Sequence, residues 1–399
     1  MSKLEDLIQE FCPDGVEYRS ILEIFNTRNG YTPSKSNKEY WENGEIPWFR
    51  MEDIRESGRI LSKATQYVSR SAVKGKAFPE NSIIISTSAT IGEHALITVP
   101  SLANQRFTYL MLKNEYKDLM DIKFVYYYCF KLDEYCKACL NQGNFASVDM
   151  KQFAKFEVPV PPLPVQEKIV RILDNFTELT AELTAELTAR KKQYEYYKNV
   201  MLAFDKIDKW VKVDEVMNFR NGKGHEKSIV TNGKYMVVNS KFISTDGVVK
   251  KYSDEQICPL YKDDILMVMS DLPGGRALAR TFLVDRDETY TLNQRICALS
   301  VKDKSKFDTL FMYYLLNRNP QLMKYDNGVD QTNLKKSDIL EIFIPAIPME
   351  KQKEIVDVLI RFDTLCNDIS TGLPAEIEAR QKQYEYYRDK LLTFKRLEV

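Results

Sequence analysis

The chain carries one nine-residue segment twice, and this duplication limits the folds that are open to it. Residues 189–197 read Ala-Arg-Lys-Lys-Gln-Tyr-Glu-Tyr-Tyr, and residues 379–387 repeat them with one change. Three further pairs of segments match: residues 26–30 with 218–222, 104–106 with 293–295, and 166–170 with 352–356. The offsets of the four pairs are 190, 192, 189 and 186 positions, far longer than the period of about 20 to 50 residues of a solenoid array. The chain therefore holds two related units end to end, which suits a quasi-two-fold ligand such as duplex DNA.

The composition predicts a multidomain protein with two or three hydrophobic cores. The 399 residues are 44% hydrophobic, enough to bury cores of ordinary size. No run of about 18 apolar residues is present, and the first residues lack the basic and then apolar pattern of a signal peptide. Seven scattered cysteines fit reduced thiols better than a disulfide framework. We therefore expect a cytoplasmic protein without a membrane segment.

The charge balance restricts any nucleic-acid role. Lys plus Arg equals Asp plus Glu at 57 each, whereas phosphate contacts need clustered positive charge. DNA binding by this chain would therefore need local basic surfaces or partners that add more.

The alternation of strand-like runs and helical stretches predicts an α/β protein with two similar mixed domains. Strand-like runs occur at residues 82–86 and 107–112, and counterparts follow at 264–269 and 296–301. Each domain also holds a helical stretch near its end. The expected division is residues 1–158 for the first domain, 159–206 for a central helical region, 207–346 for the second domain and 347–399 for a C-terminal helical region.

Both helical regions show coiled-coil spacing, with apolar residues mostly three, four or seven positions apart. In the first region these residues are Ile169, Leu173, Phe176, Leu183, Leu187, Tyr194, Tyr197 and Met201. In the second they are Ile355, Leu359, Phe362, Leu365, Ile369, Ile377, Tyr384, Tyr387, Leu391 and Phe394. Gly372 and Pro374 are expected to break the second helix. We expect the two stripes to bury each other in an antiparallel pair, with a pseudo-two-fold axis relating the two domains.

A four-residue tandem lies in the first helical region, where Thr180–Leu183 is followed by Thr184–Leu187. The helix expected over residues 166–204 has 39 residues, which at about 1.5 Å each gives roughly 60 Å, on the order of 17 base pairs. Each tandem unit adds about 6 Å and about 40° of extra twist. One interpretation is a solvated helical spacer. The other is a ruler whose unit count sets the separation of the two domains.

Several of these segments resemble one known family. Residues 28–34 (Arg-Asn-Gly-Tyr-Thr-Pro-Ser) and 40–48 (Tyr-Trp-Glu-Asn-Gly-Glu-Ile-Pro-Trp) are similar to the opening of a target recognition domain in specificity subunits of type I restriction-modification enzymes. Residues 12–18, residues 161–166 and the tandem resemble the same family, and their order and duplication extend the resemblance over the full chain. The resemblance implies that each target recognition domain reads one half of a bipartite, asymmetric DNA target. It also implies that the antiparallel coiled coil sets the unread spacer.

The resemblance implies a non-catalytic subunit, and the sequence lacks the usual catalytic motifs. We find no phosphate-binding loop of the type Gly-x-x-x-x-Gly-Lys-Ser/Thr, no amino-methyltransferase motif and only two histidines, His94 and His225. We expect no cofactor, no metal site and no catalytic residue. The partners implied are double-stranded DNA, two modification (methyltransferase) subunits that methylate adenine, and restriction (translocase and endonuclease) subunits.

Polar loop residues are the candidates for DNA contact. Features shared by both copies, such as Arg28 with Arg220 and Gln105-Arg106 with Gln294-Arg295, cannot distinguish two half-sites, so we expect them to build the frame or touch phosphates. Features that differ are candidates for base contact, because Arg and Lys favour guanine and Asn and Gln favour adenine. In the first domain these are Thr32, Ser34, Lys35, Lys38, Arg50, Arg59, Lys63 and Lys76. In the second they are Lys223, Lys227, Asn239, Lys241, Lys250, Lys251, Arg276 and Arg280. The alternative for each is an ordinary solvated side chain.

The residues of the duplicated tyrosine motif fall into two groups, on and off the apolar stripes. The tyrosines on the stripes are Tyr194, Tyr197, Tyr384 and Tyr387. We expect these four to pack between the helices, with partner binding as the alternative. Four off-stripe residues are the candidates for binding the modification subunits: Glu195, Tyr196, Glu385 and Tyr386.

Two other classes of function stay open. A scaffold could use two heads to join protein partners, and it would show no salt-sensitive binding to a bipartite duplex. An enzyme acting alone on nucleic acid would require activity from the purified chain, for which the sequence offers no constellation.

Overall fold

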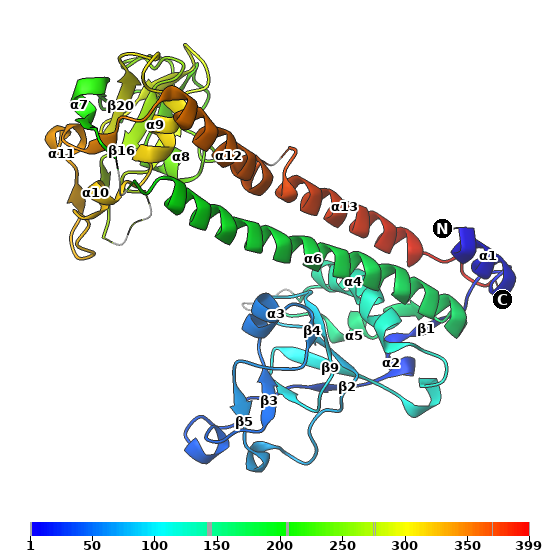
Figure 1. Cartoon of the computed structure of the whole chain (residues 1–399). Helices are drawn as coiled ribbons and strands as arrows, with labels where there is room; N and C mark the ends of the chain where they lie inside the picture. Colours follow the sequence, from blue (N-terminus) through cyan, green and yellow to red (C-terminus); the bar gives the residue numbers. More distant parts are fainter. Residues whose placement is uncertain are drawn as a thin grey trace. The chain divides into compact units, whose positions relative to one another are not determined.

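The structure is a computed structural model that describes residues 2–141, 146–204, 207–273, 275, 277–368 and 370–398. It divides into two units, Met1–Thr184 with Ile377–Val399, and Ala185–Glu376. We call residues 12–160 the first head and residues 207–346 the second head. One long helix, α6 (Leu163–Met201), contributes residues to both units (Figure 1).

The first head contains a five-stranded sheet of order β2-β9-β6-β7-β4 and a three-stranded sheet of order β5-β3-β8. The five strands are β2 (Phe25–Asn29), β9 (Phe107–Leu112), β6 (Ser82–Ser86), β7 (His94–Ile97) and β4 (Ile60–Leu61). The three are β5 (Tyr67–Val68), β3 (Ile46–Phe49) and β8 (Leu102–Ala103). Strand β6 is buried along its whole length, as its uninterrupted isoleucine run requires.

The helices that precede α6 are α1 (Ser2–Phe11), α2 (Ile21–Ile24), α3 (Met51–Ser57), α4 (Ile122–Ala138) and α5 (Met150–Phe153), with 3₁₀ turns at Lys38–Tyr40, Arg70–Ala72 and Asn114–Tyr116. Helix α4 is the principal core helix of this head. The Asp121 carboxylate caps it by accepting the Lys123 N–H at 2.8 Å, and its residues Phe124 to Cys129 are all buried.

The second head contains two four-stranded sheets, of order β12-β20-β16-β18 and β13-β15-β14-β19. The first has β12 (Met217–Asn221), β20 (Ile296–Val301), β16 (Ile265–Val268) and β18 (Thr281–Leu283), and the second has β13 (Ile229–Val230), β15 (Tyr252–Ser253), β14 (Tyr235–Val238) and β19 (Tyr290–Leu292). A two-stranded ladder joins β17 (Ser270–Asp271) and β21 (Thr332–Asn333). The helices are α7 (Val213–Val216), α8 (Ser240–Ser244), α9 (Thr309–Leu316), α10 (Pro320–Met323) and α11 (Lys336–Leu340).

The strand registers repeat between the heads with the offsets found in the sequence. The antiparallel pair Phe25 with Leu112 in the first head corresponds to Met217 with Val301 in the second. In the same way, the parallel β3–β8 ladder corresponds to the parallel β14–β19 ladder. A further ladder closes each head, β1 (Tyr18–Ser20) with β10 (Glu157–Pro159) and β11 (Trp210–Lys212) with β22 (Phe343–Pro345). The fold class is therefore confirmed as two similar mixed α/β heads joined by a helical region.

Within the first unit, the start of α6 packs against the end of α13 (Leu373–Leu391) in an antiparallel sense (Figure 1). Val165 and Ile169 of α6 share one buried cluster with Leu391. One step along, the rings of Phe176 and Tyr387 stack with centroids 5.5 Å apart. The expected stripe therefore packs as an antiparallel pair in this unit.

Within the second unit, the end of α6 packs against α12 (Met349–Asn367). The ring of Phe362 lies 6.1 Å from that of Tyr194 and 5.7 Å from that of Tyr197, centroid to centroid. The break predicted at Gly372 is confirmed, because α12 ends at Asn367 and α13 begins at Leu373. A Cβ on Gly372 would overlap the Thr364 carbonyl oxygen, so the turn needs glycine. Ile369 of the predicted stripe lies outside the described residues.

The limits of α6 differ from those predicted, although its length of 39 residues does not. The helix begins at Leu163 rather than Gln166 because Pro164 occupies the first turn, where its missing N–H costs no hydrogen bond. It ends at Met201, and Phe204 instead packs beside Phe311 of the second head, with centroids 6.2 Å apart.

The two ends of the described chain pair with each other in the first unit. The Val16 N–H donates to the Lys395 carbonyl and the Leu397 N–H to the Val16 carbonyl, both at 2.9 Å. The Tyr18 hydroxyl donates to the Phe394 carbonyl at 3.1 Å, and Arg396 forms an ion pair with Glu157. The segment after α13 is therefore part of the first head's surface.

Two global features of the described residues follow. None of their helices is both long and apolar enough to span a bilayer. The seven cysteines, all described, form no disulfide.

Candidate nucleic-acid interface

The loops after β2, β3 and β8 meet at one edge of the first head. The Gly30 N–H donates to the Phe107 carbonyl at 2.8 Å, and the Asn104 N–H donates to the Phe49 carbonyl at 3.0 Å. These bonds hold three loop segments together at the carboxyl ends of the parallel pair β3 and β8. We call this region the first loop edge, which comprises residues 30–36, 49–50 and 103–106.

The second head repeats this arrangement. The Gly222 N–H donates to the Ile296 carbonyl at 3.0 Å, and the Asn293 N–H donates to the Val238 carbonyl at 3.1 Å. We call this region the second loop edge, which comprises residues 222–228, 238–239 and 292–295. The two loop edges therefore share one backbone frame.

Glycine is required at the centre of each loop edge. A Cβ on Gly30 would overlap the carbonyl oxygens of Ala103 and Asn104, and a Cβ on Gly222 would overlap that of Asn293. Only glycine permits this close approach of two backbones. The repeated Arg-Asn-Gly and Asn-Gln-Arg segments are thus two halves of one junction.

The first loop edge brings together several predicted DNA contacts. The Thr32 hydroxyl donates to Gln105 Oε1 at 2.5 Å, while Gln105 and Arg106 stay exposed. Ser34 is exposed and its hydroxyl lies 2.7 Å from that of Ser36. Lys35 and Lys38 are exposed on the same loop.

Arg50 and Asn239 occupy equivalent places at the two loop edges, since each directly precedes a short helix, α3 or α8. The Asn239 side chain caps α8 by accepting the Phe242 N–H at 2.9 Å. Arg50 instead folds back, and its guanidinium donates to the Thr65 hydroxyl at 3.1 Å. Arg50 Nε is buried without a hydrogen-bond partner among the described residues, and it lies 3.8 Å from Glu52 Oε2. A polar side chain thus differs between the heads at one shared position.

The second loop edge brings together Lys223, Lys227, Gln294 and Arg295, all exposed. Gln294 Nε2 donates to Glu226 Oε1 at 2.6 Å. Beside this pair lies a hollow of about 670 Å³. It is lined by Gly224, Glu226, Lys227, Ser228, Val230, Asp254, Glu255 and Ile257.

The predicted DNA contacts include neither His225 nor Glu226. Extending the match of residues 26–30 with 218–222 by four positions would have aligned them with Pro33 and Ser34 of the first loop edge. His225 is buried between the Thr291 hydroxyl and the Lys223 carbonyl oxygen, each 2.8 Å from one ring nitrogen.

Other predicted contacts lie away from the loop edges. Arg59 donates to the Asp133 carboxylate and to the His94 carbonyl, both at 3.2 Å, and its guanidinium lies over the Phe130 ring. His94 Nδ1 is 2.7 Å from the same carboxylate. Burial lowers the pKa of the His94 imidazole, against the opposing effect of Asp133. Lys63 and Lys76 are exposed.

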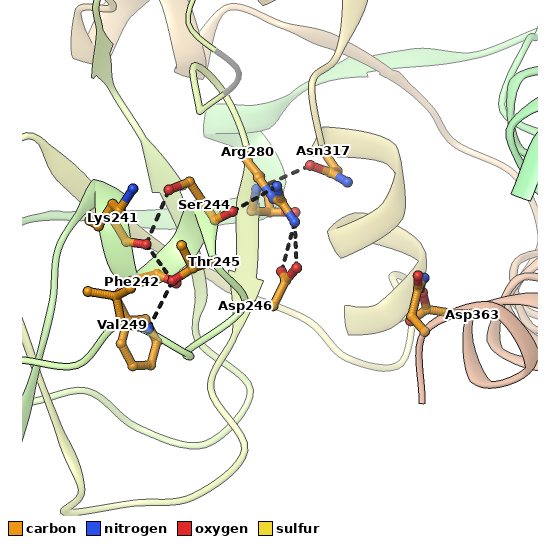
Figure 2. Close-up of polar contacts among 11 residues, drawn as sticks. Lys241, Phe242, Ser244, Thr245, Asp246, Val249, Arg280, Asn317 and Asp363 are labelled. Atoms are coloured by element: carbon orange, nitrogen blue, oxygen red, sulfur yellow. Dashed lines mark hydrogen bonds and ion pairs between the residues drawn. The ribbon is translucent and has the colours of Figure 1, made fainter. Parts of the chain in front are cut away.

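In the second head, Arg280 is bound to a carboxylate (Figure 2). Its guanidinium donates twice to Asp246, at 2.7 and 2.9 Å, and once to the Ser244 carbonyl at 3.2 Å. Lys241, whose carbonyl accepts the Ser244 and Thr245 hydroxyls, is exposed at the start of α8 (Figure 2). Lys250 and Lys251 are also exposed. Arg276 lies outside the described residues.

The shared arginines Arg28 and Arg220 belong to the frame of each head. Arg220 forms an ion pair with the buried Asp264 and donates to the Pro259 carbonyl at 2.9 Å. Arg28 lies over the Phe78 ring, 5.0 Å from its centroid. The base-contact role of every residue in the predicted sets stays a prediction.

The tyrosine motifs adopt one geometry in both copies. Tyr196 and Tyr386 are 64% and 62% exposed, and each meets the next tyrosine edge to face, with centroids 5.5 and 5.3 Å apart. Glu195 and Glu385 are exposed beside them. Tyr194 is buried, while Tyr384 and Tyr387 pack at the margin of a core cluster. The most exposed tyrosine is therefore Tyr196 in the first copy and Tyr386 in the second, and Tyr197 is 37% exposed beside Tyr196.

Among the described residues, no group of three or more His, Cys, Asp or Glu side chains is arranged to hold a metal ion.

Comparison with known proteins covers both halves of the repeat. The family model of the type I restriction modification DNA specificity domain matches residues 13–190 and 208–379. The specificity subunit of the type I restriction enzyme EcoprrI from Escherichia coli is 43% identical in an alignment 397 residues long that covers 93% of each chain.

Two solved structures share the fold. A chain from a study of complex assembly and conformational transition of the type I R-M system has a TM-score of 0.63 at 14% identity, over 95% of this chain and 98% of that one. The crystal structure of the HsdS subunit from Thermoanaerobacter tengcongensis has a TM-score of 0.52 at 15% identity, over 95% and 96%.

Proposed function

We infer the function of this chain from one premise: it belongs to the type I restriction modification DNA specificity family. We propose that it is the non-catalytic DNA-recognition subunit of a type I restriction-modification complex. Each head reads one half of a bipartite, asymmetric target, and partner subunits methylate adenine and cut.

The observation that carries this proposal is the pair of loop edges. The two have the same backbone junction, built from Gly30 with Asn104 and from Gly222 with Asn293. Their polar side chains differ, as the half-buried Arg50 and Asn239 do at one equivalent place. A common frame with unlike polar groups suits two readers of unlike half-sites, because base identity is read by side-chain hydrogen bonds in the major groove.

The functional division we propose is residues 1–158 and 207–346 for the two target recognition domains, with residues 159–206 and 347–399 forming the helical regions. Helix α6 is continuous through the tandem at Thr180–Leu187. The Thr180 and Thr184 hydroxyls donate back to the carbonyls of Phe176 and Thr180, at 2.9 and 2.8 Å. An uninterrupted helix supports a spacer whose length is set by residue count.

We propose that two modification subunits bind the exposed tyrosine motifs, one at Glu195 and Tyr196 and one at Glu385 and Tyr386. Aromatic side chains are enriched in the cores of protein interfaces, and Tyr196 and Tyr386 are the most exposed tyrosines of the motif, at 64% and 62%. Restriction subunits are the further partners in this complex. The complex acts on duplex DNA in the cytoplasm.

The test is a methylation map. The chain is expressed with its own modification subunits in a host that lacks other methylation, and the genome is sequenced for modified adenine. We expect one asymmetric motif of two parts with an unread gap. Replacing residues 20–158 with the corresponding segment of another family member should change one part and leave the other unchanged. A continuous motif, or no motif at all, would contradict the proposal.

A further inference from the structure

The glutamine that both heads share is held by a different kind of group in each. In the first loop edge the partner is neutral, since the Thr32 hydroxyl donates to Gln105 Oε1 at 2.5 Å. In the second it is anionic, since Gln294 Nε2 donates to Glu226 Oε1 at 2.6 Å. Resting on the proposed function, we propose that Glu226 is a specificity-determining residue of the second head, selecting a base that offers an exocyclic amine in the major groove.

The position of Glu226 is fixed by its neighbour in the chain. His225 is 1% exposed, and its Nε2 and Nδ1 lie 2.8 Å from the Thr291 hydroxyl and the Lys223 carbonyl oxygen. The Ser228 hydroxyl closes the turn by donating to the His225 carbonyl at 3.1 Å. Pro33 is the buried residue at the equivalent place of the first loop edge. A buried anchor thus precedes the exposed Glu226, and this limits the entropy lost when a ligand is bound.

The second loop edge also has room for the carboxylate. A Cβ built on Gly224 would lie 2.8 Å from Glu226 Oε2 and 3.5 Å from Gln294 Oε1. Both oxygens therefore lie close over Gly224, the position that Thr32 occupies in the first head. Thr32 and Ser34 of the first head are replaced by Gly224 and Glu226 in the second, which exchanges a hydroxyl for a carboxylate on the same glutamine.

The hydrogen-bonding pattern of the two loop edges then differs. At the second loop edge, one amide hydrogen of Gln294 is donated to Glu226. No described residue donates to Glu226 Oε2 or to Gln294 Oε1. That edge presents two acceptor oxygens, and the second amide hydrogen of Gln294 is its remaining donor. At the first loop edge, the Thr32 hydroxyl donates its only hydrogen to Gln105. The Gln105 amide nitrogen therefore remains a donor beside the hydroxyl oxygen.

Two adjacent acceptors select for donors on the base. In the major groove, cytosine N4 and adenine N6 are the donors, whereas guanine O6 and thymine O4 are acceptors that a carboxylate rejects. A carboxylate also gains nothing from phosphates, which repel it. Its contribution to a DNA-facing surface therefore lies in discrimination between bases. We expect the second half-site to have cytosine or adenine at the position facing Glu226.

The test is Glu226→Gln in the full chain, purified with its modification subunits. Gln keeps the size of the side chain and restores a donor. Binding to duplexes that vary one base pair at a time should lose discrimination at a single pair of one half-site, on the order of tenfold to a hundredfold. The other half-site and the gap should stay as they are.

Glu255→Gln is the matched control, since it removes the same charge from the wall of the same hollow but touches neither glutamine. We expect its specificity to equal that of the unsubstituted chain. An equal loss in both variants would overturn the inference in favour of a general charge effect, as would an unchanged motif in Glu226→Gln. Absence of any bipartite motif with the unsubstituted chain would instead contradict the proposed function.

Discussion

The buried side chains of Gln166 and Gln352 make the same three hydrogen bonds in the two halves of the chain. Each amide nitrogen donates to two backbone carbonyls, and each amide oxygen accepts the N–H of the aspartate that caps a core helix, α4 or α9. The partners of Gln166 are Leu119, Pro161 and Asp121, at 2.8, 2.6 and 2.8 Å. Those of Gln352 are Lys306, Ile347 and Asp308, at 2.8, 2.9 and 2.8 Å. One buried glutamine therefore ties each head to the start of a long helix.

Gln166→Leu should destabilise the first unit by about 2 to 4 kcal/mol, because it leaves buried carbonyl and N–H groups without partners. Hydrogen exchange should become faster at the Asp121 amide and stay unchanged at the Asp308 amide. Gln352→Leu should give the reverse pattern, so each variant is the control for the other. Glu167→Gln, at an exposed neighbour in α6, should change stability by less than about 0.5 kcal/mol. Equal protection of Asp121 in all variants would contradict the assigned role.

The first head should lose stability in mild acid. Burial lowers the pKa of His94 below its ordinary value of 6.5, so below that pH the unfolded chain binds a proton that the folded head does not. The stabilisation is complete above about pH 6.5 and falls by up to roughly 1.4 kcal/mol per pH unit as the pH drops toward the lowered pKa.

The measurement is urea unfolding at pH 7.5 and 5.5, followed by tryptophan fluorescence. In a Trp210→Phe background, the two remaining tryptophans, Trp41 and Trp48, both report on the first head. His94→Asn should reduce the difference in unfolding free energy between the two pH values. A difference that survives this substitution in full would assign the effect to other groups.

Deleting Thr184–Leu187 should shorten the unread gap without changing either half-site. The deletion removes about 6 Å of α6 and about 40° of twist, which corresponds to about one or two base pairs. Methylation mapping would show the new gap directly. Thr184→Ala, which keeps the residue count, is the control and should leave the gap as it was. An unchanged gap after the deletion favours the plain spacer over the ruler.

Tyr196→Ala and Tyr386→Ala should each weaken the binding of one modification subunit. Native mass spectrometry of the purified complex would detect the loss as a species with one subunit fewer, and the double variant should lose both. Tyr325→Ala removes a 43% exposed tyrosine outside the motif and should keep the full complex. Complete assembly of the double variant would place the binding surface elsewhere.

The repeat made most of the fold predictable. Once residues 26–30 were matched with 218–222, and 104–106 with 293–295, the second head followed from the first, since one local pattern produces one local structure. The broken second helix followed from the poor helix propensity of Gly372.

Contacts between distant segments were not predictable. The sequence predicts Arg59 in a loop, yet its partner Asp133 is 74 positions away. The two residues meet because α4, which carries Asp133, packs against β7. The pairing of Val16 with Lys395 likewise depends on where α13 ends. Glu226 was within reach of the sequence, because only the alignment of the loops after Gly30 and Gly222 was needed to find it.

The pairing of Val16 with Lys395 and Leu397 has a consequence for biosynthesis. Residues 377–398 leave the ribosome after the whole second unit, yet the first unit needs them to cover Phe124, Ile169 and their neighbours. During synthesis, the N-terminal part of the first unit therefore keeps apolar surface uncovered until residues 377–398 have been made. A chain that terminates before Ile377 would lack the residues that cover this apolar surface.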